Sequence, residues 1–292
     1  MLDLPWGQLL VNGLALGSLY ALTAFGIVLI YKTTDVINFA QGELAMFTTF
    51  IAFWLITQVQ LPFLAAFVLT LLCAGGLGVL IERVVLRPLG DTSPLSPVMV
   101  TVGLGLVLYG LAGWIWGYET RTFAAPVGGE PLRLVSLVLS RLNALILIVT
   151  LILMAILFGF FRYTLTGTAM RAVAQNRVAA RLMGISVNRI NALGWGLGAA
   201  LGAVTGILIA PLNYLDPGMM GDVAIKAFAA AVLGGITSLP GAVVGGLLLG
   251  VIDSVVGFNY PELRTTIAFG LIVLVLVVRP GGLLGRREIK KV

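Results

Sequence analysis

The sequence is dominated by a succession of apolar stretches, each separated from the next by a short polar segment. The first runs from about Gln8 to Tyr31, and further stretches cover residues 61–81, 98–117, 144–161 and 193–212. A helix crosses the hydrocarbon core of a bilayer with roughly twenty predominantly apolar residues. Inside lipid every backbone polar group needs an internal partner, so only helices and closed barrels can span it. The pattern therefore predicts a polytopic membrane protein.

The composition favours helices over a barrel. The sequence is 59% apolar and contains 37 glycines, and it lacks the alternating ten-residue pattern of outer-membrane strands. Small residues at helix contacts allow backbones to approach closely in lipid. We therefore expect an all-α, polytopic transmembrane helical bundle of about eight to ten helices, with broken or re-entrant segments and eight or nine crossings.

Charge and reactive groups exclude several functional classes. Only 10% of residues are charged, histidine is absent, and Cys73 is the only cysteine. The net charge of +6 is concentrated in loops and at the C-terminus, which is typical of membrane topology rather than nucleic-acid binding. The sequence thus lacks the commonest metal ligand and general base, and a disulfide cannot form within the chain. Neither an enzyme nor a metal site is expected.

One long polar segment, residues 162–191, interrupts the apolar pattern. It holds five of the eighteen lysines and arginines: Arg162, Arg171, Arg177, Arg181 and Arg189. Such arginine-rich loops face the cytoplasm. Residues 167–183 favour a helix, Gly184 stands where helices often end, and Ser186 is placed to cap a second short helix. The segment is predicted to form two short helices hinged at a glycine, and the alternative is an ordinary basic loop that only fixes topology.

A second polar stretch precedes the apolar run at residues 44–56. Its side chains Asp35, Asn38, Gln41 and Glu43 would be costly if they faced lipid. We therefore expect a broken or protein-lined segment here. The four side chains belong either to a solvated loop or to the lining of a solute route.

A similar interruption occurs near residue 235. Gly235 and Ser238 fall in a run of glycine, serine and proline that breaks what would otherwise be one long helix. Lys226 and Asp253 are the ionisable residues expected at membrane depth, where charge is usually functional. The alternative for Lys226 is a structural side chain that extends to the outer surface.

Two spans share a feature that suggests an internal repeat. The first span and the span at 193–212 both carry glycine stripes, and each is followed by a polar break that begins Asp-Val, at Asp35 and at Asp222. Paired, inverted interrupted helices indicate a central solute route. If the repeat holds, one half lines the route with Asn38, Gln41 and Glu43, and the other half with Lys226, Gly235 and Ser238.

Several motifs resemble a known family of permeases. INFAQGE at residues 37–43 is similar to the INFAHGE segment of LivH-type permeases, with Gln41 in place of the usual histidine. KAF, GG, SLPGA and GG between residues 226 and 246 resemble the same family, as do ERVVLRPLG after residue 81 and the basic end of the chain. The polar segment resembles the family's cytoplasmic coupling loop through Gly167, Arg171, Ala172, Gln175, Asn176, Ala179, Ala180, Gly184 and Ile185.

LivH-type permeases are membrane subunits of ATP-binding-cassette importers for branched-chain amino acids and related solutes. The resemblance implies a multi-pass permease subunit in the bacterial inner membrane. The implied partners are a LivM-like second permease, two cytoplasmic ATPase subunits and a periplasmic solute-binding protein. The residues implied to couple this chain to the ATPase are Gly167, Arg171, Ala172, Gln175, Asn176, Ala180 and Gly184.

The chain lacks the GxxxxGK[ST] phosphate-binding loop. We therefore expect no cofactor on this chain, with ATP and Mg²⁺ used by the ATPase subunits. The predicted organisation is one membrane domain with its N-terminus outside: a first half at 8–161, the coupling loop at 162–191, a second half at 192–281 and a basic cytoplasmic tail at 282–292.

The alternative function is an ATP-independent channel or an ion-coupled secondary transporter. Such a protein needs several carboxylates or histidines at membrane depth, and here only Glu43 and Asp253 are candidates. The sequence leaves open the solute, since urea, amides, and aromatic or dicarboxylic acids are alternatives to branched-chain amino acids. It also leaves open whether the permease pairs with itself or with a related chain.

Overall fold

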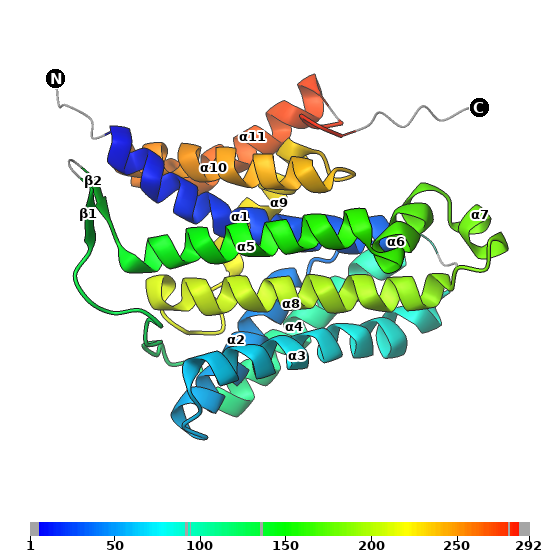
Figure 1. The fold of residues 1–292 in the computed structure, drawn as a ribbon, viewed down its shortest axis with the longest axis horizontal. Helices are drawn as coiled ribbons and strands as arrows, with labels where there is room; N and C mark the ends of the chain where they lie inside the picture. The colour runs from blue at the N-terminus through cyan, green and yellow to red at the C-terminus, as the bar shows by residue number, and fades with distance from the viewer. Residues whose placement is uncertain (1–5, 91–92, 94, 135–136, 280, 286–292) are drawn as a thin grey trace. The chain divides into compact units, whose positions relative to one another are not determined.

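The computed structural model describes residues 6–90, 93, 95–134, 137–279 and 281–285, and the described chain is mainly helical (Figure 1). Residues 286–292 of the expected basic tail lie outside the described residues. The α-helices are α1 (Trp6–Thr34), α2 (Gln41–Thr57), α3 (Phe63–Ile81), α4 (Leu95–Trp116), α5 (Arg141–Tyr163), α6 (Leu165–Gln175), α7 (Arg177–Leu182), α8 (Val187–Asn213), α9 (Gly221–Gly234), α10 (Leu239–Asn259) and α11 (Arg264–Val278). A π-helical turn, η1 (Glu82–Leu86), and two 3-10 turns, η2 (Arg87–Leu89) and η3 (Pro261–Leu263), complete the helical elements.

Seven helical segments among the described residues are long and apolar enough to span a bilayer: Trp6–Thr34, Phe63–Leu89, Leu95–Trp116, Arg141–Tyr163, Val187–Asn213, Leu239–Asn259 and Pro261–Val278. The helices α2 and α9 have 17 and 14 residues and are shorter. Helix α2 begins within the first predicted interruption, and α9 ends at the second, near residue 235. The prediction of an all-α, multi-pass membrane bundle with broken segments is confirmed; eight or nine crossings are expected from the sequence, and seven described segments have the length and hydropathy to cross.

The connection between α4 and α5 contains two short antiparallel strands, β1 (Leu132–Leu134) and β2 (Leu137–Leu139). Gln8 at the start of α1 explains why strand geometry is stable here. Its side-chain amide accepts from the N–H of Val138 at 3.0 Å and donates to the C=O at 2.8 Å. This pairing satisfies both backbone groups of an edge residue.

The chain forms two compact units whose segments alternate along the sequence. Unit 1 consists of Met1–Val28, Ala124–Thr150 and Asp222–Val292, and unit 2 consists of Leu29–Phe123 and Leu151–Gly221. The element order repeats a long helix, a break and a short helix, first in α1 and α2 and again in α8 and α9. Asp222 lies in the first turn of α9 and not in the break itself. The inverted orientation of the two halves stays a prediction.

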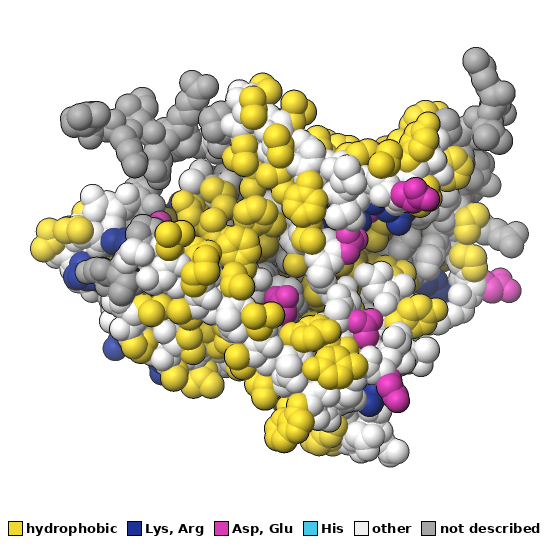
Figure 2. Space-filling model, turned by 180° about the vertical axis from the view of Figure 1, so that it is seen from behind, with side chains coloured by type: hydrophobic (Ala, Val, Ile, Leu, Met, Phe, Trp, Pro, Cys, Tyr) yellow, Lys and Arg dark blue, Asp and Glu magenta, His cyan; other side chains and the backbone are white. Residues whose placement is uncertain are grey.

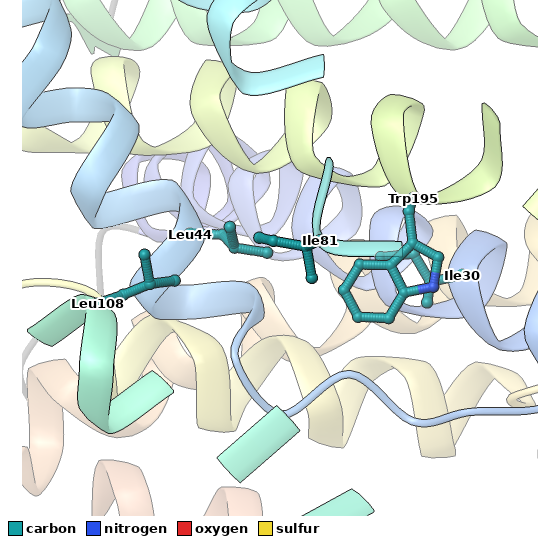
Figure 3. Close-up of a cluster of buried hydrophobic side chains, with 5 residues drawn as sticks. All are labelled: Ile30, Leu44, Ile81, Leu108 and Trp195. Carbon is teal, nitrogen blue, oxygen red and sulfur yellow. The ribbon is translucent and has the colours of Figure 1, made fainter. Parts of the chain in front are cut away.

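Five helices each contribute one side chain to a buried apolar cluster in unit 2 (Figure 3). Trp195 of α8 lies beside Ile30 of α1 at one end of the cluster, and Leu108 of α4 lies at the other end, with Leu44 and Ile81 between them. Apolar burial alone provides little driving force between helices in lipid, so association depends on close packing. The cluster therefore fixes the helix arrangement through shape.

The glycine stripe of α8 makes that close packing possible. A Cβ on Gly206 would lie 2.7 Å from the carbonyl oxygen of Ala45 on α2, and a Cβ on Gly202 would lie 2.9 Å from Nε2 of Gln41. Such separations are too short for a side chain, so only glycine allows the two helices to approach this closely. The predicted role of the stripe in tight helix packing is confirmed.

In unit 1 the same principle joins α1 to α10. A Cβ on Gly17 of α1 would lie 2.9 Å from the carbonyl oxygen of Gly246 on α10, and one on Gly13 would lie 2.7 Å from Cα of Val251. The two helices are therefore in backbone contact along the stripe that the sequence shows in the first span.

Large apolar side chains are exposed on the outer helices. Leu106 on α4, Leu151 on α5 and Val277 on α11 are 70%, 68% and 77% exposed. Figure 2 shows such side chains gathered over much of one face, with acidic side chains as isolated spots. Extended exposed apolar surface marks contact with a membrane or a partner, which agrees with the seven described segments that are long and apolar enough to span a bilayer.

Candidate functional site

The break between α1 and α2 in unit 2 holds two buried amide side chains. Asn38 and Gln41 are 2% and 1% exposed. Asn38 donates to Oε1 of Gln41 at 3.1 Å and accepts from the N–H of Ala40 at 3.1 Å, while Nε2 of Gln41 donates to the carbonyl oxygen of Gly198 on α8 at 2.9 Å. The non-helical backbone is thus held by protein groups, as the predicted protein-lined segment requires. The alternative of a solvated loop does not fit Asn38 and Gln41.

Glu43 lies in the first turn of α2 and faces a glycine of α4. A Cβ on Gly105 would lie 3.3 Å from Oε2 of Glu43. This oxygen is buried, and within the described part of the chain it has no hydrogen-bond partner. A buried acceptor without a donor is costly. Among the three side chains predicted for this part of the route, Glu43 is therefore the one suited to accept a hydrogen bond from a solute or water.

Lys226 of α9 is the buried centre of an ion network in unit 1, between the buried Asp253 and Asp222, whose side chain is 51% exposed. Its Nζ lies 3.0 Å from Oδ1 of Asp253 on α10 and 2.7 Å from Oδ2 of Asp222. The hydroxyl of Tyr20 on α1 donates to Oδ2 of Asp253 at 3.0 Å, and Thr265 of α11 donates to Oδ1 of Asp222 at 3.0 Å. Lys226 and Asp253 are 3% and 5% exposed, so the ammonium group does not extend to an outer surface. The network joins four helices of unit 1.

The polar segment at 162–191 forms α6, α7 and the start of α8, and its hinge differs from the prediction. A continuous helix over 167–183 is wrong, because the segment breaks at Asn176, whose side chain accepts from the N–H of Ala179 at 2.9 Å and caps α7. A second cap stabilises α6, since Thr164 accepts from the N–H of Gly167 at 2.9 Å. Gly184 has a φ of +80° after the end of α7, as expected for a helix-terminating glycine. Ser186 precedes the long helix α8 and not a separate short helix.

The two faces of this helical pair have different characters. One face packs on α8 through a buried cluster: Met170, Val173, Ala180, Val187 and Ile190. Of the residues predicted for coupling, Gly167 and Ala180 are buried, Ala172 is half-buried, and Arg171, Gln175, Asn176 and Gly184 are exposed. The exposed face also carries large apolar side chains, since Leu182 and Met183 are 84% and 82% exposed. Arginine and methionine are enriched at protein interfaces, so this face has the composition of a docking surface.

The comparison with protein families covers nearly the whole chain. Residues 9–276 match the family described as "Branched-chain amino acid transport system / permease component". The chain belongs to this family. Among curated relatives, this permease is 39% identical to BraD of Pseudomonas aeruginosa, named a high-affinity branched-chain amino acid transport system permease protein, over 98% of this chain and 97% of that protein. It is 34% identical to LivH of Escherichia coli K12, which bears the same description, over 98% of this chain and 97% of that protein.

A solved structure supports the fold of the permease. A chain of PsaBC from Streptococcus pneumoniae in complex with Fab superposes with a TM-score of 0.51 at 12% sequence identity, covering 96% of this chain and 94% of that chain. At this identity the likeness concerns the fold alone. The family membership shows that the chain is a transport permease component rather than an enzyme.

The remaining two residues predicted for the route shape the turn between α9 and α10 of the permease. Gly235 has a φ of +105°, and a Cβ on it would lie 2.7 Å from the carbonyl oxygen of Gly281. Ser238 caps α10, because its hydroxyl accepts from the N–H of Gly241 at 3.1 Å. The helix break that the sequence predicts here is confirmed. That these two residues line a route stays a prediction.

Several residues of these groups could not be assigned to them from the sequence. Asp222 precedes Lys226 by one helical turn, and this i,i+4 spacing could have indicated their ion pair. Tyr20 gave no local signal, because its partner Asp253 is 233 residues away in the sequence. Arg177 is one of five arginines in the polar segment, and its sequence position does not indicate that it contacts the end of α1.

Proposed function

We propose that this permease is the membrane subunit of an ATP-driven importer in the bacterial inner membrane, and that it forms the route for branched-chain amino acids or a related small polar solute. The observation that carries this proposal is the match over residues 9–276 to permease components, together with the full-length relatives BraD and LivH. Because the chain has no phosphate-binding loop of the GxxxxGK[ST] type, the energy comes from other subunits.

The proposed assembly contains three further kinds of subunit. A LivM-like second permease completes the membrane part, two cytoplasmic ATPase subunits bind ATP and Mg²⁺, and a periplasmic binding protein delivers the solute. The exposed apolar surface of the outer helices gives a second permease room to bind. In such an assembly the binding protein selects the solute, so the route itself needs few polar groups, which agrees with the small set around Asn38, Gln41 and Glu43.

Coupling follows from the exposed face of α6 and α7. Arg171, Leu182 and Met183 present one charge and two large apolar side chains to a partner. Docked in a cleft of the ATPase, this helical pair moves when the ATPase dimer closes around nucleotide, and the movement shifts the permease between outward-facing and inward-facing states. The solute shifts the same equilibrium only through its different affinities for the two states.

The ion network weighs against an ion-coupled transporter. That alternative needs free carboxylates at membrane depth, and Asp253 is engaged by both Lys226 and Tyr20. Of the two candidate carboxylates, Asp253 is neutralised by its ion pair with Lys226 at 3.0 Å, whereas Oε2 of Glu43 has no hydrogen-bond partner in the described structure. One such group offers a coupling ion few ligands.

Co-purification tests the proposal. The permease is expressed with an ATPase and a second permease from the same operon, isolated through a tag on this chain, and assayed for ATP hydrolysis with and without the binding protein. A stable complex whose hydrolysis rises when the loaded binding protein is added supports the importer. Arg171→Ala should weaken the complex, while Arg83→Ala, which removes an exposed arginine of η1 outside the segment, should not.

If the chain purifies alone and moves solute into liposomes without ATP, the importer proposal fails and the secondary-transporter alternative holds. The exposed face of α6 and α7 would then need another partner.

A further inference from the structure

One arginine of the coupling segment reaches out of it and contacts the end of α1. Arg177 is the first residue of α7, and its Nη2 donates to the carbonyl oxygen of Thr33 at 2.5 Å. Its Nε lies 3.1 Å from Oδ2 of Asp35. Arg171, by comparison, bonds to Thr168 within its own helix at 3.2 Å. Arg177 therefore connects α7 to the end of α1 within unit 2.

The contact lies at the C-terminal end of α1. Thr33 is the next-to-last residue of α1, so its carbonyl group has no intrahelical partner. A cation at a helix C-terminus is favourable because the helix dipole is negative there. The same residue is in tight contact with Gly194 of α8. The end of α1 thus contacts α7 through the hydrogen bond of Arg177 and contacts α8 at Gly194.

The contact lies directly before the candidate solute route. Asp35 begins the break, with a φ of 55°, and Asn38 and Gln41 follow within six residues. Nε2 of Gln41 in turn donates a hydrogen bond to the carbonyl oxygen of Gly198. A displacement of α7 that is passed to Thr33 therefore reaches the buried amides through a short, non-helical piece of chain.

We propose that Arg177 carries the movement of α6 and α7 to the break that contains Asn38 and Gln41. This inference rests on the proposed function, because it takes ATPase docking on α6 and α7 as the source of the movement. Arg177 acts as a positioning residue, since it works through the end of α1 and bonds to Thr33 and Asp35 rather than to Asn38 or Gln41.

The two contacts of Arg177 contribute unequally. The side chains of Arg177 and Asp35 are 33% and 70% exposed, and exposed ion pairs of this kind contribute little because solvent screens them. The hydrogen bond to Thr33 is partly buried and charge-assisted, which makes it the stronger of the two. Removing the arginine should therefore have a much larger effect than neutralising Asp35.

The test measures solute taken up per ATP hydrolysed by the complete complex in proteoliposomes. Arg177→Ala should lower this ratio about tenfold, a typical size for a coupling effect between sites, while complex formation and ATP hydrolysis persist. Arg177→Met keeps the apolar stem and good helix propensity without a donor, so it should give the same loss even if the alanine variant is less stable. Asp35→Asn should change the ratio less than about twofold, and Arg83→Ala should leave it unchanged.

Each outcome decides the question. A normal ratio in Arg177→Met or Arg177→Ala overturns the link and leaves the importer intact. Parallel loss of hydrolysis and uptake, or failure to assemble in both variants, assigns Arg177 a structural role and also overturns it. Absence of ATP-dependent uptake with the unsubstituted chain instead contradicts the proposed function itself.

Discussion

At the scale of single residues, Lys226 shows how a full charge is kept inside an apolar unit. Its ammonium group lies within 3.0 Å of both Asp222 and Asp253, and Asp253 accepts a further hydrogen bond from Tyr20. A buried ion pair does not stabilise a protein strongly compared with apolar packing, but removing one partner leaves an uncompensated charge. The network is therefore expected to be sensitive to single substitutions and tolerant of paired ones.

Substitution of the lysine tests this asymmetry. Lys226→Met should lower the stability of the permease in detergent by about 3 kcal/mol, because Asp253 loses its counter-charge in a buried site. The double variant Lys226→Met with Asp253→Leu should recover part of that loss. Thermal unfolding of the purified chain measures both, with the exposed carboxylate variant Glu119→Gln as control. A double variant less stable than Lys226→Met would show that the network contributes more than charge compensation.

Gln41 offers a second test at this scale, because its role depends on a donor. Nε2 of Gln41 donates to the carbonyl oxygen of Gly198, and a carboxylate cannot donate. Gln41→Glu should therefore destabilise the contact between α2 and α8 by roughly 2 kcal/mol and reduce uptake. Gln41→His supplies a ring N–H and should retain most activity. Equal uptake by the two variants would show that transport does not depend on this hydrogen bond.

At the scale of helices, the coupling segment shows which local signals were sufficient and which were not. Its basic character, its helical composition and the terminating Gly184 could be predicted from the sequence. The break at Asn176 could not, because one asparagine within a helix-favouring run gives no decisive signal until its side chain is seen to cap α7. The buried face of the segment became visible only with its partner residues on α8.

Two substitutions in this segment test coupling without disturbing the membrane helices. Arg171→Ala removes a charge from the exposed face, and Gly184→Ala strains a residue whose φ is +80° by about 1 kcal/mol. Each should abolish most ATP-driven uptake while the chain still inserts and purifies normally. Uptake assays with membrane-fraction immunoblots measure both properties. Normal uptake by both variants would remove the coupling assignment from α6 and α7.

Substitutions in the turn between α9 and α10 test the role of this helix break in unit 1. Ser238→Leu removes the cap on Gly241 and adds bulk at a helix break, so it should cost about 1 kcal/mol of stability and lower uptake. Ser238→Asp keeps a capping oxygen and should retain the stability of the cap. If Ser238→Leu transports normally, the solute route lies away from this turn.

The breaks and the long helices were the parts of the fold that the sequence could indicate, since span length and runs of polar residues are local properties. The assignment of helices to units was not local. Helix α1 contributes Tyr20 to the ion network of unit 1 and Ile30 to the apolar cluster of unit 2. Nothing in the spacing of α1 distinguishes these two ends. Tertiary contacts between distant segments therefore had to come from the structure.

At the scale of the whole molecule, the described residues contain seven helical segments long and apolar enough to span a bilayer, and residues 9–276 match a transport permease family. We propose that its transport is driven by ATP bound to partner subunits. Within unit 2 the proposed chain of contacts runs from α7 through Arg177 to the end of α1 and on to Gln41. These contacts can transmit movement only if a partner subunit moves the coupling segment.

The most direct test is uptake of a labelled branched-chain amino acid into proteoliposomes that contain the complete complex, with binding protein outside and ATP with Mg²⁺ inside. We predict uptake against a concentration gradient that stops when ATP is replaced by a non-hydrolysable analogue. Equal uptake with the analogue, or uptake by this chain alone driven by an ion gradient, would contradict ATP-driven transport. Binding-protein exchange in the same vesicles would then identify the solute.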